Sequence, residues 1–183
     1  MTVVGILGAL WGIVGVLLLL GSAIYRLTSV FWEAFSYVFE WYHWVGLTGC
    51  VLFMIVSEGY QGFQKAFSPR VVARARYLIA FPSILFSLLA PLFCMGYFHA
   101  TRRRQIASIV LTVGIVLMIL AVRLVPQPWR GIIDAGVVAG LAWGVVTLLV
   151  FCVRAFLTDG FDYSPEVPEE DSGPVSGEQR YGD

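Results

Sequence analysis

VVGILGALWGIVGVLLLLGSAIY, residues 3–25, contains no charged side chain. A helix needs about 20 mostly apolar residues to cross the hydrocarbon core of a bilayer. Only internal hydrogen bonds can satisfy the backbone there, which favours a helix. Because no basic residue precedes this run, we interpret it as a retained transmembrane helix rather than a cleaved signal peptide.

Small residues recur on this first helix at three- and four-residue spacing, namely Gly5, Gly8, Gly12 and Gly15. Such a face lets another helix approach closely, either within the chain or in a protein partner or homo-oligomer. The simpler interpretation is the general enrichment of glycine in membrane helices.

Four further apolar runs follow, and they predict spans at about residues 41–60, 77–98, 106–122 and 132–153. Aromatic and basic residues flank these runs, as is typical of membrane interfaces. Pro82 and Pro91 predict a kink in the third span. The predicted fold is therefore all-α, a polytopic transmembrane helix bundle of about five spans.

Two segments outside the spans have different compositions. Residues 27–40 are rich in aromatic side chains, which favours a short helix lying in the membrane interface. Residues 158–183 combine acidic residues with proline and glycine, which predicts a disordered, solvated tail. The chain thus divides into a transmembrane domain, residues 1–157, and an acidic tail, residues 158–183.

The composition agrees with a membrane protein, since 58% of the residues are hydrophobic and 13% are charged. The formal net charge of zero conceals an asymmetry, because eight of the twelve acidic residues lie from Asp159 onward. The part before Asp159 carries about +7, so anionic lipids are expected partners. Nucleic acid is not expected, because the arginines do not form one continuous face.

The distribution of basic residues leaves the orientation undetermined. With five spans, six basic residues fall on the side of the N-terminus and five on the other side. Cytoplasmic loops normally carry the excess of Lys and Arg. Either one basic cluster violates this rule, or one supposed span does not cross the membrane.

The stretch SEGYQGFQKAFSPR, residues 57–70, holds the first candidate site. A hairpin turning between Gly59 and Phe67 would return Arg70 and Arg74 to the level of Glu58. Ser68 before Pro69 would then be the N-cap of the next helix. Three readings remain open: an internal ion pair, a site for a lipid phosphate or small anion, and arginines that only reach the interface while Glu58 faces water.

The second candidate consists of the only two histidines, His43 and His99, which an antiparallel helix pair would place on one face. Together with the basic interface cluster of Arg102, Arg103 and Arg104, they would suit a haem or metal ion. Histidine is also ordinary among interfacial aromatic residues, which is the favoured reading. No cofactor is expected, and the three cysteines are interpreted as small buried hydrophobes.

No catalytic, nucleotide-binding or metal motif is present, so enzymatic activity is not expected. The favoured function is a non-catalytic component of a cell or plasma membrane that binds anionic lipid or a protein partner. One alternative is an oligomeric transporter or channel subunit that uses Glu58 with Arg70 and Arg74. Another is a membrane enzyme acting on a lipid headgroup, with Glu58 as general base.

Overall fold

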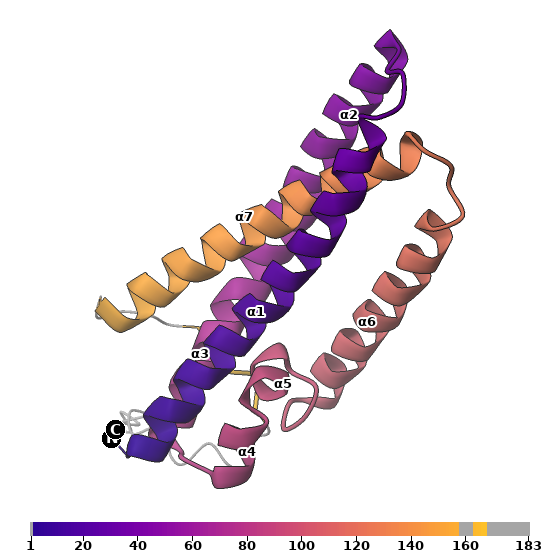
Figure 1. Ribbon diagram of the computed structural model, residues 1–183. Helices are drawn as coiled ribbons and strands as arrows, with labels where there is room; N and C mark the ends of the chain where they lie inside the picture. Colours follow the sequence, from indigo (N-terminus) through magenta and orange to yellow (C-terminus); the bar gives the residue numbers. More distant parts are fainter. Residues whose placement is uncertain (1, 158–162, 168–183) are drawn as a thin grey trace, which may run out of the picture.

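The computed structural model describes residues 2–157 and 163–167, and these residues form helices without any strand (Figure 1). The helices are α1 (Val3–Ala34), α2 (Trp41–Met54), η1 (Ile55–Phe67), α3 (Ser68–Ala80), α4 (Ile84–Leu88), α5 (Ala90–Met95), α6 (Arg102–Val122) and α7 (Trp129–Leu157). The prediction of an all-α bundle is confirmed. The predicted acidic tail, apart from residues 163–167, lies outside the described residues.

Three helices, α1, α6 and α7, are long and apolar enough to cross a membrane, so the chain is an integral membrane protein. They contain the predicted first, fourth and fifth spans. The aromatic segment is not a separate helix, because α1 continues to Ala34. Phe35 stacks on Phe39, and Phe39 makes a tilted ring contact with Trp44, and these contacts fix the turn into α2.

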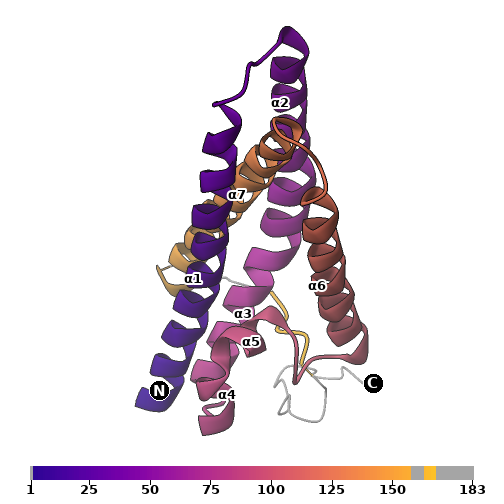
Figure 2. The same ribbon diagram turned by 45° about the vertical axis from the view of Figure 1, so that its right-hand side comes forward.

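The expected hairpin after Glu58 is absent. Helices α2, η1 and α3 follow one another without a break, so residues 41–80 form one rod (Figure 2). In η1 the hydrogen bonds widen to the π pattern, and Ser68 N–H still donates to the carbonyl of Phe63. Pro69, which has no N–H to donate, comes directly after this change of pattern.

The predicted third span is broken rather than kinked. Helix α3 ends at Ala80, and Pro82 lies in the short non-helical link before α4. Pro91 lies in the first turn of α5, and Gly96 ends that helix with a φ of +85°. Helices α4 and α5 fold back beside the last turns of α3 and do not run to the opposite end (Figures 1 and 2).

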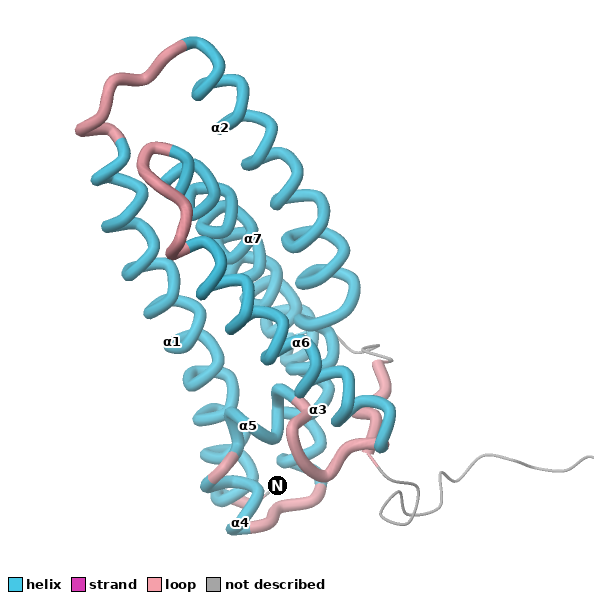
Figure 3. Tube along the Cα trace, turned by 90° about the vertical axis from the view of Figure 1, so that its right-hand side faces the viewer, coloured by secondary structure: helices cyan, strands magenta, loops and turns pink. Residues whose placement is uncertain are grey.

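This arrangement gives the bundle two ends, which we name by their helices (Figure 3). The α3 end holds the end of α3, all of α4 and α5, and the starts of α1 and α6. The α2 end holds the start of α2, the start of α7 and the ends of α1 and α6. A residue near either terminus of α1, of the rod, of α6 or of α7 can therefore be assigned to one of the two ends.

The glycine face of α1 packs inside the chain. A Cβ on Gly5 would lie 2.7 Å from the carbonyl oxygen of Leu78, and one on Gly15 would lie 2.3 Å from Cγ of Pro91. Gly8 and Gly12 meet Ser87 and Cys94 in the same way. The close approach predicted from the spacing is thus made to α3, α4 and α5, and a contact of this face with a partner stays a prediction that would require those elements to move.

A second small-residue face, on α7, receives the rod. A Cβ on Gly136 would lie 2.6 Å from Sγ of Cys50, and one on Gly144 would lie 2.6 Å from the ring of Phe63. A Cβ on Gly140, which lies between them, would be 3.2 Å from the carbonyl oxygen of Met54. The rod can pass α7 at this distance only because these positions have no side chain.

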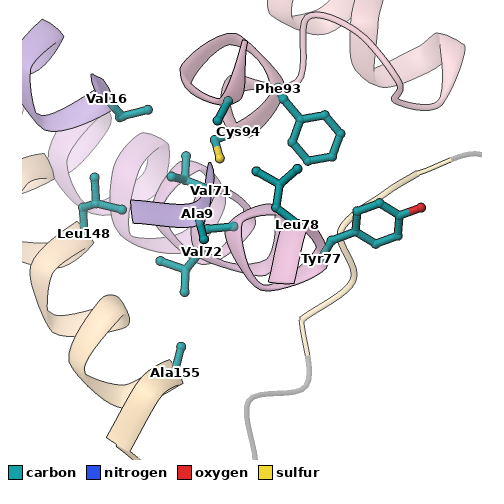
Figure 4. Packing of buried hydrophobic residues seen from close by; sticks show 12 residues of the cluster. Ala9, Val16, Val71, Val72, Tyr77, Leu78, Phe93, Cys94, Leu148 and Ala155 are labelled. Carbon is teal, nitrogen blue, oxygen red and sulfur yellow. The ribbon is translucent and has the colours of Figure 1, made fainter. Parts of the chain in front are cut away.

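The best-buried apolar residues gather at the α3 end, where α1, α3, α5 and α7 meet (Figure 4). Val71 and Val72 of α3 lie near Val16 of α1 and Leu148 of α7, and Leu78 lies farther along α3 toward Phe93. Phe93 and Cys94 cover this cluster from α5. The core therefore anchors the broken segment to the bundle and fixes the positions of the polar residues beside it.

Candidate functional site

Arg74 lies at the centre of the polar groups at the α3 end. It projects from α3 and is 2% exposed. Its Nε donates to the carbonyl oxygen of Phe93 at 2.6 Å, and its Nη2 donates to those of Phe98 and His99 at 2.9 Å each. Its guanidinium also lies 4.2 Å from the centre of the Phe93 ring.

Arg74 extends this network to the segment after α7. Its Nη1 donates to the carbonyl oxygen of Pro165 at 2.8 Å. The planar guanidinium thereby joins α3, the α5–α6 connection and residues 163–167. A lysine could not reproduce this geometry, because its donors sit on one atom.

Residues 163–167, which we call the strap, pack on the bundle at this point. Thr101 N–H donates to the carbonyl oxygen of Glu166 at 3.1 Å, and Glu166 N–H donates to Ser164 Oγ at 3.2 Å. Tyr163 meets the Phe151 ring edge-on, and Val167 packs against the core cluster. This part of the predicted tail is therefore not free in solvent.

The strap brings one carboxylate to two arginines. Glu166 Oε1 lies 3.8 Å from Nη1 of Arg70, and its Oε2 lies 3.8 Å from Nε of Arg104. These arginines come from α3 and from the first turn of α6. The arrangement is a small anion site that is filled by a residue of the same chain.

The start of α6 is positioned by the end of α5. Ser108 Oγ donates to the carbonyl oxygen of Met95 at 3.2 Å. A Cβ on Gly96 would lie 3.4 Å from Nε of Arg104, and the positive φ of Gly96 disfavours any other residue there. The tight turn at Gly96 thus lets Arg104 turn toward α3, while Arg102 and Arg103 remain exposed.

The structure separates the other predicted site residues. Glu58 lies twelve residues before Arg70 on the same rod, with no turn of the chain between them. It packs instead near Gly140 of α7. The structure therefore does not bring Glu58 beside Arg70 and Arg74, because that meeting required a turn between Gly59 and Phe67.

Ser68 and the two histidines also have other surroundings. Ser68 is fully buried within the continuous rod and lies 3.2 Å from Thr147 Oγ1 of α7, so its predicted role as an N-cap is wrong. His43 accepts a hydrogen bond from Glu40 N–H at the α2 end. His99 lies at the α3 end beside the Phe86 ring. The expected meeting of His43 and His99 therefore does not occur.

Among the residues that the structure describes, no three His, Cys, Asp or Glu side chains lie together. Two hollows are open on the surface, one lined by α1 residues around Tyr25 and the other by residues around Pro82. Neither is lined by Arg70, Arg74 or Arg104. The side chain of Glu166 is 38% exposed, so its site with Arg70 and Arg104 lies at the surface.

Comparison with protein-family models, with curated proteins and with solved structures found no match.

Sequence reasoning named Arg70 and Arg74 of α3 but missed Glu166, the anion beside Arg70, which it assigned to the solvated tail. One signal was available. Tyr163 and Val167 flank Glu166 with side chains that favour burial, within a stretch otherwise composed mainly of polar residues, Pro and Gly. Such residues in an acidic tail indicate a docking segment.

Proposed function

We propose that this protein is a non-catalytic integral membrane component that binds anionic lipid headgroups at its α3 end. The supporting observation is the convergence of Arg70 and Arg104, from two helices, on a single anion. Exposed Arg102 and Arg103 continue this basic surface outward. Arginine binds phosphate with paired hydrogen bonds, so the surface suits the phosphate of a lipid headgroup.

The same geometry supports an orientation. If α1, the rod of residues 41–80, α6 and α7 each cross the membrane, the start of α1 and the strap lie on the same side of it. That side receives Arg70, Arg74, Arg76, Arg102, Arg103, Arg104 and Arg154, whereas Arg26, Arg123 and Arg130 lie toward the α2 end. By the positive-inside rule, the α3 end then lies on the cytoplasmic side of a cell or plasma membrane. The balance of six against five disappears because residues 84–95 are not counted as part of a crossing.

The alternatives receive less support. Both the transporter with a coupling site and the enzyme acting on a lipid headgroup required Glu58 beside Arg70 and Arg74. In the structure Glu58 lies elsewhere on the rod, so neither site is assembled. A protein partner remains compatible with α6, of which only Ser108 is buried, but an exposed apolar helix also suits lipid.

The experiment measures lipid binding to the purified protein by native mass spectrometry, with phosphatidylglycerol as the anionic lipid and phosphatidylcholine as the neutral one. We expect the native protein to prefer phosphatidylglycerol. Arg102→Gln with Arg103→Gln should weaken that preference, because each exposed basic residue near the surface contributes about 1 kcal/mol to attraction of anionic lipid.

The matched control is Arg26→Gln with Arg123→Gln, which removes two exposed charges away from the α3 end. This variant should retain the preference of the native protein. Equal losses in both variants, or no preference in the native protein, would contradict the proposal.

A further inference from the structure

The carboxylate of Glu166 lies near Arg70 and Arg104 but does not form a hydrogen bond with either of them. Its contacts of 3.8 Å with Arg70 and with Arg104 are longer than the 2.7–3.2 Å usual for a hydrogen bond between N–H and oxygen. The attraction is therefore one of charge, and guanidinium donors of both residues are not used by this carboxylate. Glu166 also carries one negative charge between two positive ones.

Main-chain contacts hold the strap in place together with the carboxylate. The carbonyl oxygens of Pro165 and Glu166 accept from Arg74 and from Thr101 N–H. Glu166 itself has a φ of +51°, a left-handed conformation that non-glycine residues rarely adopt. The backbone thus presents the side chain to the two arginines at some conformational cost.

A phosphate group matches these two arginines better than a carboxylate does. It carries more oxygens, arranged in three dimensions, and each guanidinium can bind two of them. The position lies beside the first turn of α6, where the helix dipole also favours an anion. The Glu166 side chain is 38% exposed and the neighbouring Arg102 and Arg103 are exposed, so a headgroup would reach the site from the surface.

We infer that Glu166 is an internal competitor for the phosphate site formed by Arg70 and Arg104, and that an anionic lipid displaces it and releases the strap. This inference rests on the proposed lipid-binding function and adds its regulation. The strap keeps the site filled when anionic lipid is scarce. Binding of the phosphate then frees residues 163–167.

The experiment compares Glu166→Gln with the native protein in the same lipid-binding measurement. The variant keeps the shape of the side chain but removes the competing charge. We expect binding of phosphatidylglycerol to tighten about fivefold, the effect of losing a contact of about 1 kcal/mol. Adding Arg70→Gln to Glu166→Gln should abolish the gain.

Glu33→Gln is the control, because Glu33 is an exposed carboxylate near the α2 end. It should leave lipid binding unchanged. Inorganic phosphate, tested alone as a soluble ligand, separates the two sources of the anion: a matching gain with it assigns the site to free phosphate as well, and a gain with lipid alone assigns it to headgroups.

Hydrogen exchange of the native protein tests the same inference without any substitution. The amide of Thr101, which donates to Glu166, and the amide of Glu166 should exchange faster in nanodiscs with phosphatidylglycerol than in phosphatidylcholine alone. Unchanged exchange together with an unchanged affinity of Glu166→Gln would overturn the inference. If the native protein still preferred anionic lipid through Arg102 and Arg103, the proposed function would survive that result.

Discussion

Nη1 of Arg74 donates a hydrogen bond of 2.8 Å to the carbonyl oxygen of Pro165, a residue ninety-one positions later in the chain. The same guanidinium binds three carbonyl oxygens around the end of α5. One buried side chain thus holds the broken segment and the strap against α3. Arg74 is consequently a structural residue, whereas Arg70 and Arg104 face the anion.

Replacing Arg74 by lysine should destabilise the protein by about 2–4 kcal/mol, because hydrogen bonds from a charged group contribute about 1.5–3 kcal/mol each and lysine cannot restore all of them. Unfolding by denaturant in detergent measures the loss. Arg102→Lys, at an exposed position, should change stability by less than about 0.5 kcal/mol. Equal stability of the two variants would contradict the structural role of Arg74.

The packing of α1 on α3 is tested by two glycines of the same helix. Gly5→Ala should cost about 1–3 kcal/mol, since the new Cβ would lie 2.7 Å from the backbone oxygen of Leu78. Gly21→Ala has no atom within 4 Å of the new Cβ and should be neutral or stabilising by about 1 kcal/mol or less. Thermal unfolding of both variants provides the comparison, and a Gly5→Ala protein as stable as Gly21→Ala would refute this packing.

Much of the fold could be predicted because long apolar runs are a local property. Residues 106–122 and 132–153 match the cores of α6 and α7 closely. The rod of residues 41–80 could not be predicted in this way. The sequence predicted a turn beginning at Gly59, but a glycine costs a helix only about 1 kcal/mol. Packing of α2 and η1 on Gly136, Gly140 and Gly144 of α7 outweighs that cost, and no local pattern reveals this long-range contact.

The broken segment was misjudged for the opposite reason. Residues 77–98 are apolar enough on average to resemble a span, and averaging hides where a helix stops. Pro82 and Gly96 end helices at both sides of α4 and α5, and the glycines of α1 then let these short helices approach α1 closely. The candidate site was half predicted in consequence: Arg70 and Arg74 share the expected face, but the break brings Arg104 and Glu166 to them in place of Glu58.

The path of the chain between α3 and α6 decides every assignment to an end of the bundle. Single cysteines at Ser36, Leu124 and Gln105, labelled in sealed vesicles with a membrane-impermeant maleimide, measure it directly, and the native protein with Cys50, Cys94 and Cys152 gives the background. We predict that Ser36→Cys and Leu124→Cys react from one side and Gln105→Cys from the other. Reaction of Ser36→Cys and Leu124→Cys from opposite sides would show that the chain between α1 and α6 crosses the membrane either twice or not at all, and would contradict this account.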